Sequence, residues 1–121
     1  MRQLILVFIG GGFGSVFRYI LGKYLNHPET GIPLGTFAAN IIGSFLIGII
    51  LGLAAKNEAL DQNQTLLLAT GFCGGFTTFS TFAYENYVFL KGGDFVSFAF
   101  YTIVSFVMTF LAVFLGMYLI K

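Results

Sequence analysis

Charged residues are scarce in this chain. Of its 121 residues, six are Lys or Arg, five are Asp or Glu and one is His, so 9% are charged, against about 25% in a typical soluble domain. So few charges cannot cover a water-facing surface, and the mean hydropathy of +0.89 agrees. The composition excludes an ordinary cytosolic enzyme, a nucleic-acid-binding protein and a disordered chain. A single cysteine, Cys73, excludes an internal disulfide and a cysteine metal cluster.

The chain contains long apolar stretches that are almost free of charged residues. A helix needs about 20 mostly apolar residues to cross a membrane, and four stretches of the chain meet this requirement: residues 3–24, 33–55, 63–90 and 95–120. The runs are continuous rather than alternating, which argues against a transmembrane β-barrel. The first run contains no small-residue cleavage site, so we do not expect a cleaved signal peptide. The sequence predicts an all-α, integral membrane protein with a single four-helix domain over residues 1–121.

Positive charges are divided evenly between the two sides of this predicted domain. With the N-terminus inside, the inner flanks hold Arg2, Lys56 and Lys121, and the outer flanks hold Arg18, Lys23 and Lys91. An excess of Lys and Arg on one side normally sets the orientation. Either a small bias is enough here, or the chain inserts in both orientations. The second case would allow two opposed copies to form an antiparallel dimer.

Small and polar side chains recur at helical spacing within the spans. Glycines four residues apart let helices approach closely in lipid, either within one chain or between two copies: Gly10/Gly14, Gly48/Gly52 and Gly71/Gly75. Two rows of polar side chains repeat every four residues: Thr36, Asn40 and Ser44, then Ser97, Tyr101, Ser105 and Thr109. Each row serves either as hydrogen-bonding contacts between helices or as a polar pathway.

The third span contains a segment that is poorly suited to a helix. Residues 71–82 combine three glycines with a cluster of Thr and Ser, so we expect a break here. Freed carbonyl groups at membrane depth must be satisfied by protein, water or an ion, and would suit a small cation such as Na⁺. Phe76, Phe79 and Phe82 recur every three residues. Their rings either pack or turn their positive edges toward an anion.

These motifs resemble those of the CrcB/Fluc fluoride channel family. The match includes Gly11-Gly12 and Arg18-Tyr19 in the first span, and residues 35–40 and 43–45 in the second. It also includes the third-span run from Gly71 to Phe82, continuing to Glu85. The resemblance covers all four spans, and the third-span motif is long and specific.

The resemblance implies a fold and a set of site residues. The family forms antiparallel, dual-topology homodimers with two fluoride pores, in a bacterial inner or plasma membrane, that export fluoride passively and so confer fluoride resistance. The implied pathway residues are Phe79 and Phe82 as an aromatic box, Asn40 as a donor, Ser105 and Thr109 as a hydroxyl track, and Thr36 and Tyr101 near its ends. Backbone carbonyls of Gly74 and Thr77 from both subunits would hold a structural Na⁺. Arg18 either attracts anions at a vestibule or extends to the membrane surface, and Glu85 receives no role.

Two other functions compete with a fluoride channel. A small proton-coupled multidrug exporter also has four short helices, but it needs a carboxylate within the membrane. The first span has none, and Glu85 lies toward the end of the third. A non-transporting membrane assembly protein explains the glycines and phenylalanines, but not two polar rows beside a broken span. An enzyme is not expected, because the sequence offers no metal-ligand cluster and no nucleophile paired with a base.

Overall fold

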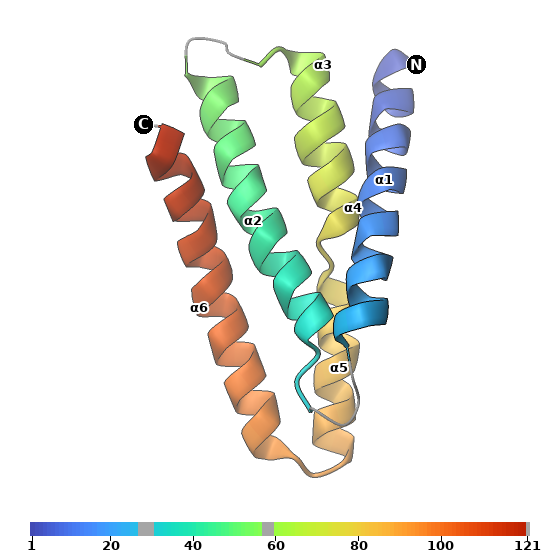
Figure 1. Ribbon diagram of the computed structural model, residues 1–121, viewed down its shortest axis with the longest axis vertical. Helices are drawn as coiled ribbons and strands as arrows, with labels where there is room; N and C mark the ends of the chain where they lie inside the picture. Colours follow the sequence, from blue (N-terminus) through green and yellow to red (C-terminus); the bar gives the residue numbers. More distant parts are fainter. Residues whose placement is uncertain (27–30, 57–59, 121) are drawn as a thin grey trace.

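Helices form almost all of the chain. The computed structural model describes residues 1–26, 31–56 and 60–120. Its elements are α1 (Arg2–Leu25), α2 (Leu34–Ala55), α3 (Gln62–Thr65), a π-helical segment (Leu66–Cys73), α4 (Gly74–Phe76), α5 (Phe79–Lys91) and α6 (Phe95–Ile120) (Figure 1). Within the described residues, four helical stretches are long and apolar enough to cross a membrane: α1, α2, the third span over Gln62–Lys91, and α6. The prediction of an all-α protein with four spanning helices is confirmed.

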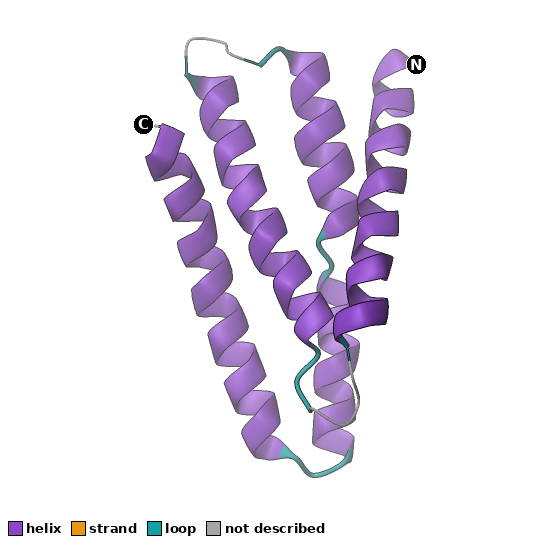
Figure 2. Ribbon diagram, viewed as in Figure 1, coloured by secondary structure: helices purple, strands orange, loops and turns teal. Residues whose placement is uncertain are grey.

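The third span is built from two half-helices joined by Thr77 and Thr78. The first half ends where the backbone N–H and hydroxyl of Thr77 both donate to the Cys73 carbonyl, at 2.9 and 2.8 Å. The second half begins at Thr78, whose hydroxyl accepts the Thr81 N–H at 3.3 Å as an N-cap. Figure 2 shows this interruption between α4 and α5. The predicted break is therefore present, and it lies at the threonines, while Gly71, Gly74 and Gly75 remain helical.

Glycines allow the helices to approach one another closely within the chain. A Cβ added to Gly14 of α1 would meet the Phe72 carbonyl, and one added to Gly48 of α2 would meet the Val113 carbonyl of α6. Such contacts leave room only for hydrogen. Of the two interpretations of the glycine pairs, the structure shows packing within one chain. As a result, α1 lies along the first half of the third span and α2 lies along α6.

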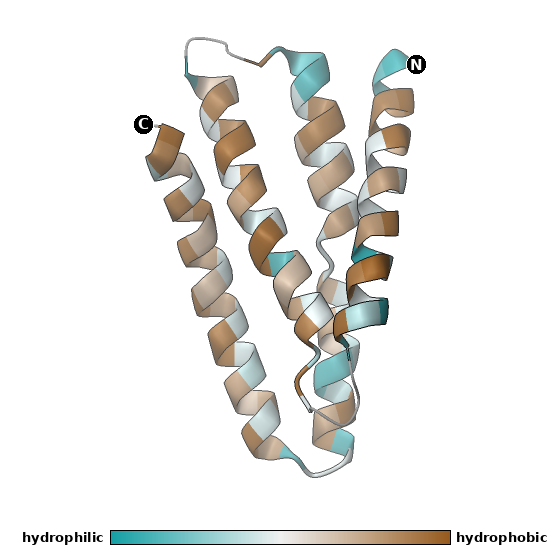
Figure 3. Ribbon diagram, in the orientation of Figure 1, coloured by the Kyte–Doolittle hydropathy of each residue, from teal (hydrophilic) through white to brown (hydrophobic). Residues whose placement is uncertain are grey.

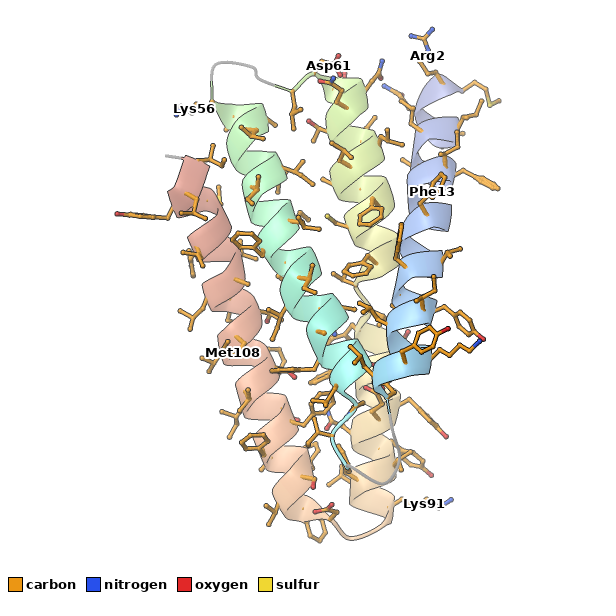
Figure 4. All side chains as sticks on the ribbon, in the orientation of Figure 1. Arg2, Phe13, Lys56, Asp61, Lys91 and Met108 are labelled. Carbon is orange, nitrogen blue, oxygen red and sulfur yellow. The ribbon has the colours of Figure 1, made fainter. Side chains whose placement is uncertain are left out.

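The outside of the bundle is apolar along its length. Large hydrophobic side chains are exposed on every span; Phe8, Phe13 and Phe114, for example, are 61–70% exposed. Figure 3 shows hydrophobic residues along the helices and hydrophilic ones mainly near their ends and on α5. Figure 4 shows Arg2, Lys56 and Asp61 at one end of the bundle and Lys91 at the other. This distribution fits a bundle that is surrounded by lipid between two aqueous surfaces.

Candidate functional site

A pocket of about 220 Å³ lies beside the break in the third span. Its wall joins α2, the break, α5 and α6, through Asn40, Ser44, Thr77, Thr78, Phe79, Phe82, Ser105, Phe106 and Thr109. Five of the predicted pathway residues therefore meet at one place: Asn40, Phe79, Phe82, Ser105 and Thr109. The pocket side chains of the two polar rows, Asn40 and Ser44 on α2 and Ser105 and Thr109 on α6, face it from neighbouring helices, because α2 and α6 pack against each other.

Two phenylalanine rings form the aromatic part of the wall. The centroids of Phe79 and Phe82 are 5.7 Å apart, with their planes inclined at 41°. Phe82 is buried, and its ring lies 5.0 Å from Tyr101 and 6.0 Å edge-on from Phe106. Phe79 is 70% exposed. The packing around Phe82 fixes one ring, whereas Phe79 forms a side of the pocket that the chain itself leaves open.

Asn40 joins α2 to the break by two hydrogen bonds. The Thr78 N–H donates to Asn40 Oδ1 at 2.8 Å, and Asn40 Nδ2 donates to the Thr78 carbonyl at 3.2 Å. Thr78 has an extended backbone at the break, and the amide bonds to its N–H and its carbonyl as another peptide group would. The sequence pointed to Asn40 as a polar side chain within a span, but it gave no sign of its partner.

Ser105 and Thr109, the two hydroxyl residues of α6 that line the pocket, differ in whether their hydroxyl hydrogen is free to donate. The Thr109 hydroxyl donates to its own helix, at 2.8 Å to the Ser105 carbonyl and 3.2 Å to the Phe106 carbonyl. The Ser105 hydroxyl is buried and has no hydrogen-bond partner within the described part of the chain. A buried polar group without a partner requires an explanation. Ser105 is also a lining residue of the pocket, which makes its unpaired hydroxyl a candidate donor to a ligand there.

Thr36 and Tyr101 gather around a carboxylate instead of lining the pocket. Thr36 donates to Glu85 Oε2 at 2.7 Å, and the Tyr101 hydroxyl donates to Glu85 Oε1 at 2.8 Å. Asn26 extends the network by donating to the Thr36 hydroxyl at 3.3 Å. The Tyr101 ring packs on Phe82, so this network adjoins the pocket. The spacing of residues gives Glu85 no role, although a carboxylate within an apolar span signals that donors must lie nearby.

Arg18 reaches from α1 to the end of the first half-helix. Its Nε donates to the Gly75 carbonyl at 3.1 Å, which places a positive charge at a helix C-terminus. Arg18 also lines a second cavity, of about 350 Å³, together with Lys23, Thr36, Thr78 and Thr81. The Arg18 guanidinium therefore bonds directly to the first half-helix at the break, and it also faces a polar cavity next to the break.

Several carbonyls around the break are already engaged. Those of Cys73, Gly75 and Thr78 accept hydrogen bonds from Thr77, Arg18 and Asn40. Gly74 and Thr77, the two predicted cation ligands, lie between them; Gly74 is exposed and Thr77 is half-buried. Carbonyl oxygens are hard ligands of the kind that alkali and alkaline-earth cations prefer. The residues present therefore fit a Na⁺ site.

The chemistry of the pocket favours an anion. Its wall offers an amide, hydroxyls and the edges of aromatic rings, and none of the described residues lining it carries a negative charge. Amide N–H, hydroxyl and ring-edge hydrogens all carry positive partial charge. An anion leaving water could exchange its hydration shell for these groups.

The family model described as "CrcB-like protein, Camphor Resistance (CrcB)" matches residues 5–117. The chain belongs to the CrcB family. The match extends from α1 to α6 and so includes every element of the pocket. Together with the four apolar helices, family membership makes this chain a multi-pass membrane protein.

Individual CrcB relatives match over nearly their whole length. A protein of Gloeothece citriformis is 52% identical over 100% of this chain and 98% of its own. A Bacteroides fragilis protein is 45% identical over 98% of this chain and 96% of its own. A Leptospira interrogans protein is 42% identical over 99% and 95%. Each of the three is named fluoride-specific ion channel FluC.

Proposed function

We propose that this CrcB protein is a fluoride-selective channel that exports fluoride passively and lowers its concentration in the cytoplasm. The observation that carries the proposal is the pocket in which Asn40, Ser105 and the two phenylalanine rings meet without a carboxylate in the wall. The full-length relatives named as fluoride-specific channels support the choice of ion.

The mechanism replaces water around a small, strongly hydrated anion. Fluoride enters from one aqueous side and exchanges waters for the Asn40 amide, the Ser105 hydroxyl and the edges of Phe79 and Phe82. Each group supplies a positive partial charge, so the cost of leaving water is offset along the route. Chloride is larger and accepts weaker hydrogen bonds, so a narrow route of this kind disfavours it. A negative-inside potential drives an anion outward by about 2.3 kcal/mol per charge per 100 mV.

Thr36 and Tyr101 continue the route beyond the pocket. Each gives its single hydroxyl hydrogen to a Glu85 carboxylate oxygen, so in this proposal fluoride takes the place of that oxygen as it passes. Thr109 also lines the wall, but its hydroxyl hydrogen is used by its own helix. Arg18, next to a polar cavity, attracts anions toward the entrance.

The working unit in this proposal is an antiparallel homodimer in which two copies insert in opposite orientations. The even division of Lys and Arg between the two flanks supports insertion both ways. The exposure of Phe79, at 70%, leaves room for a second chain to complete the wall. A Na⁺ held by the Gly74 and Thr77 carbonyls of both copies would neutralise carbonyl dipoles at the break and join the subunits.

Efflux from liposomes that contain only this polypeptide tests the proposal. Vesicles loaded with potassium fluoride or potassium chloride are diluted into buffer that contains only an impermeant anion, valinomycin lets K⁺ leave with the anion, and release is followed with ion-selective electrodes. We expect rapid fluoride release, little chloride release, and no fluoride release from Asn40→Asp, because the substitution adds a negative charge to the wall. Chloride release equal to that of fluoride, or normal release from Asn40→Asp, would contradict the proposal. Proton-dependent efflux of an organic cation would favour the exporter instead.

A reporter at the C-terminus tests the opposed dimer. We expect the reporter to lie on both sides of the membrane in similar proportions. A single orientation in all molecules would reject dual topology while leaving the fluoride assay to decide the ion.

A further inference from the structure

Asn40 and Thr78 form a contact in which every donor and acceptor is assigned without ambiguity. Thr78 is the N-cap of α5 and has an extended backbone, with φ −155° and ψ 123°. The N–H can only donate and the C=O can only accept. Oδ1 of Asn40 must therefore face the N–H, and Nδ2 must face the carbonyl.

Rotation of the amide by 180° is strongly opposed. It would place Oδ1 against the Thr78 carbonyl and Nδ2 against the Thr78 N–H. Both hydrogen bonds would be lost, and like partial charges would meet at each position. The break in the third span thus selects one orientation of a side chain that is free to adopt either orientation in water.

This orientation decides what Asn40 offers to the pocket. Nδ2 carries two hydrogens, and the one on the same side as Oδ1 donates to the Thr78 carbonyl. The second hydrogen points away from Thr78, and Asn40 lines the pocket. The acceptor oxygen is engaged by the Thr78 N–H at 2.8 Å. Asn40 thus has one hydrogen left to donate at the pocket wall, while its acceptor oxygen is occupied by the Thr78 N–H.

We propose that the main chain of Thr78 locks the Asn40 amide with its free N–H toward the pocket, and that this lock helps the site to select anions over cations. The same residue caps α5, which begins at Phe79, so the contact also fixes the donor relative to the first aromatic ring. The identity of the anion rests on the proposed function, whereas the lock itself does not.

The lock is tested on the full-length protein in the absence of fluoride. Hydrogen exchange at the Thr78 backbone N–H is measured by NMR in lipid nanodiscs for the wild type, Asn40→Ala and Asn63→Ala. Asn63 is in α3, outside the pocket, and provides the matched control. We expect exchange at Thr78 to accelerate on the order of tenfold in Asn40→Ala, as loss of one hydrogen bond implies, with no change in Asn63→Ala. Equal exchange rates in all three proteins would overturn the lock.

Fluoride then tests the direction of the free hydrogen. The two Nδ2 hydrogens of Asn40 are followed in a sample with ¹⁵N-labelled asparagine, and Asn40→Ser identifies their signals. We expect added sodium fluoride to move only the hydrogen that lies opposite Oδ1, while the Asn63 signals stay in place. Movement of the other hydrogen, or of neither in a protein that passes fluoride, would overturn the proposal. If the wild type passes no fluoride, the proposed function fails and the exchange measurement still decides the lock.

Discussion

The Thr109 hydroxyl donates to the carbonyl of Ser105 one turn earlier, 2.8 Å away, whereas the Ser105 hydroxyl has no partner among the described residues. The two side chains line the same pocket, but only the serine has a hydrogen to offer an anion. We predict that Ser105→Ala slows fluoride efflux on the order of tenfold, the equivalent of about one hydrogen bond. Thr109→Val should change efflux much less, because the lost hydroxyl was bonded to its own helix. Equal effects of the two substitutions would contradict this assignment.

Substitutions at the two phenylalanines should distinguish an effect on fluoride efflux from an effect on stability. Phe79 is 70% exposed, while Phe82 is 7% exposed and packs against Tyr101 and Phe106. Isoleucine keeps an apolar side chain but removes the ring edge, so Phe79→Ile and Phe82→Ile should both reduce fluoride efflux. Only Phe82→Ile should also lower the thermal unfolding midpoint clearly. Undiminished efflux in both variants would assign the rings to packing alone.

Two neighbouring glycines in α1 provide a matched test of the helix contacts. A Cβ at Gly14 would meet the backbone of Phe72 and Phe76, whereas one at Gly12 meets nothing within 4 Å. Gly14→Ala should therefore lower the free energy of unfolding by about 1–3 kcal/mol, as overpacking does. Gly12→Ala should leave it unchanged or raise it by up to about 1 kcal/mol, since alanine favours a helix. Denaturant unfolding in detergent measures both, and a stable Gly14→Ala variant would contradict the observed packing.

Arg18 and Lys23 carry the same charge and lie on the same helix, but their side chains have different partners. Arg18 donates to the Gly75 carbonyl, whereas Lys23 is exposed, with its ammonium 5.7 Å from the Tyr24 ring. Arg18→Ala should destabilise the protein by about 1–3 kcal/mol, the range for a hydrogen bond to a charged group. Lys23→Ala should have little effect on stability, and thermal unfolding compares the two. Equal thermal unfolding midpoints for the two variants would contradict a stabilising hydrogen bond and leave Arg18 only an electrostatic role.

The four spans and the approximate place of the break could be predicted from the sequence, because each has a physical cause that shows in residue type. Membrane thickness fixes the length of an apolar run, so four runs predict four helices. The Gly and Thr cluster marked the third span, because such residues weaken a helix. The break itself lies at Thr77 and Thr78, since threonine side chains cap both half-helices there.

Other features depend on contacts that spacing does not reveal. The π-helical turns of Leu66–Cys73 have no signature in the apolar pattern. Helical spacing placed Thr36 and Asn40 on one face, but Thr36 bonds to Glu85 while Asn40 bonds to Thr78. The partner of each polar side chain is set by the helix opposite, and the order of residues in one chain leaves that choice open.

The reversal potential of the protein in a planar bilayer shows directly which ion the pathway selects. Fluoride is placed at different concentrations on the two sides, with the same Na⁺ concentration on both and gluconate as the balancing anion. The account predicts that current reverses at the fluoride equilibrium potential and stays there when chloride replaces gluconate. Reversal near zero, or a shift toward the chloride equilibrium potential, would contradict a pathway in which amide, hydroxyl and ring-edge hydrogens select fluoride.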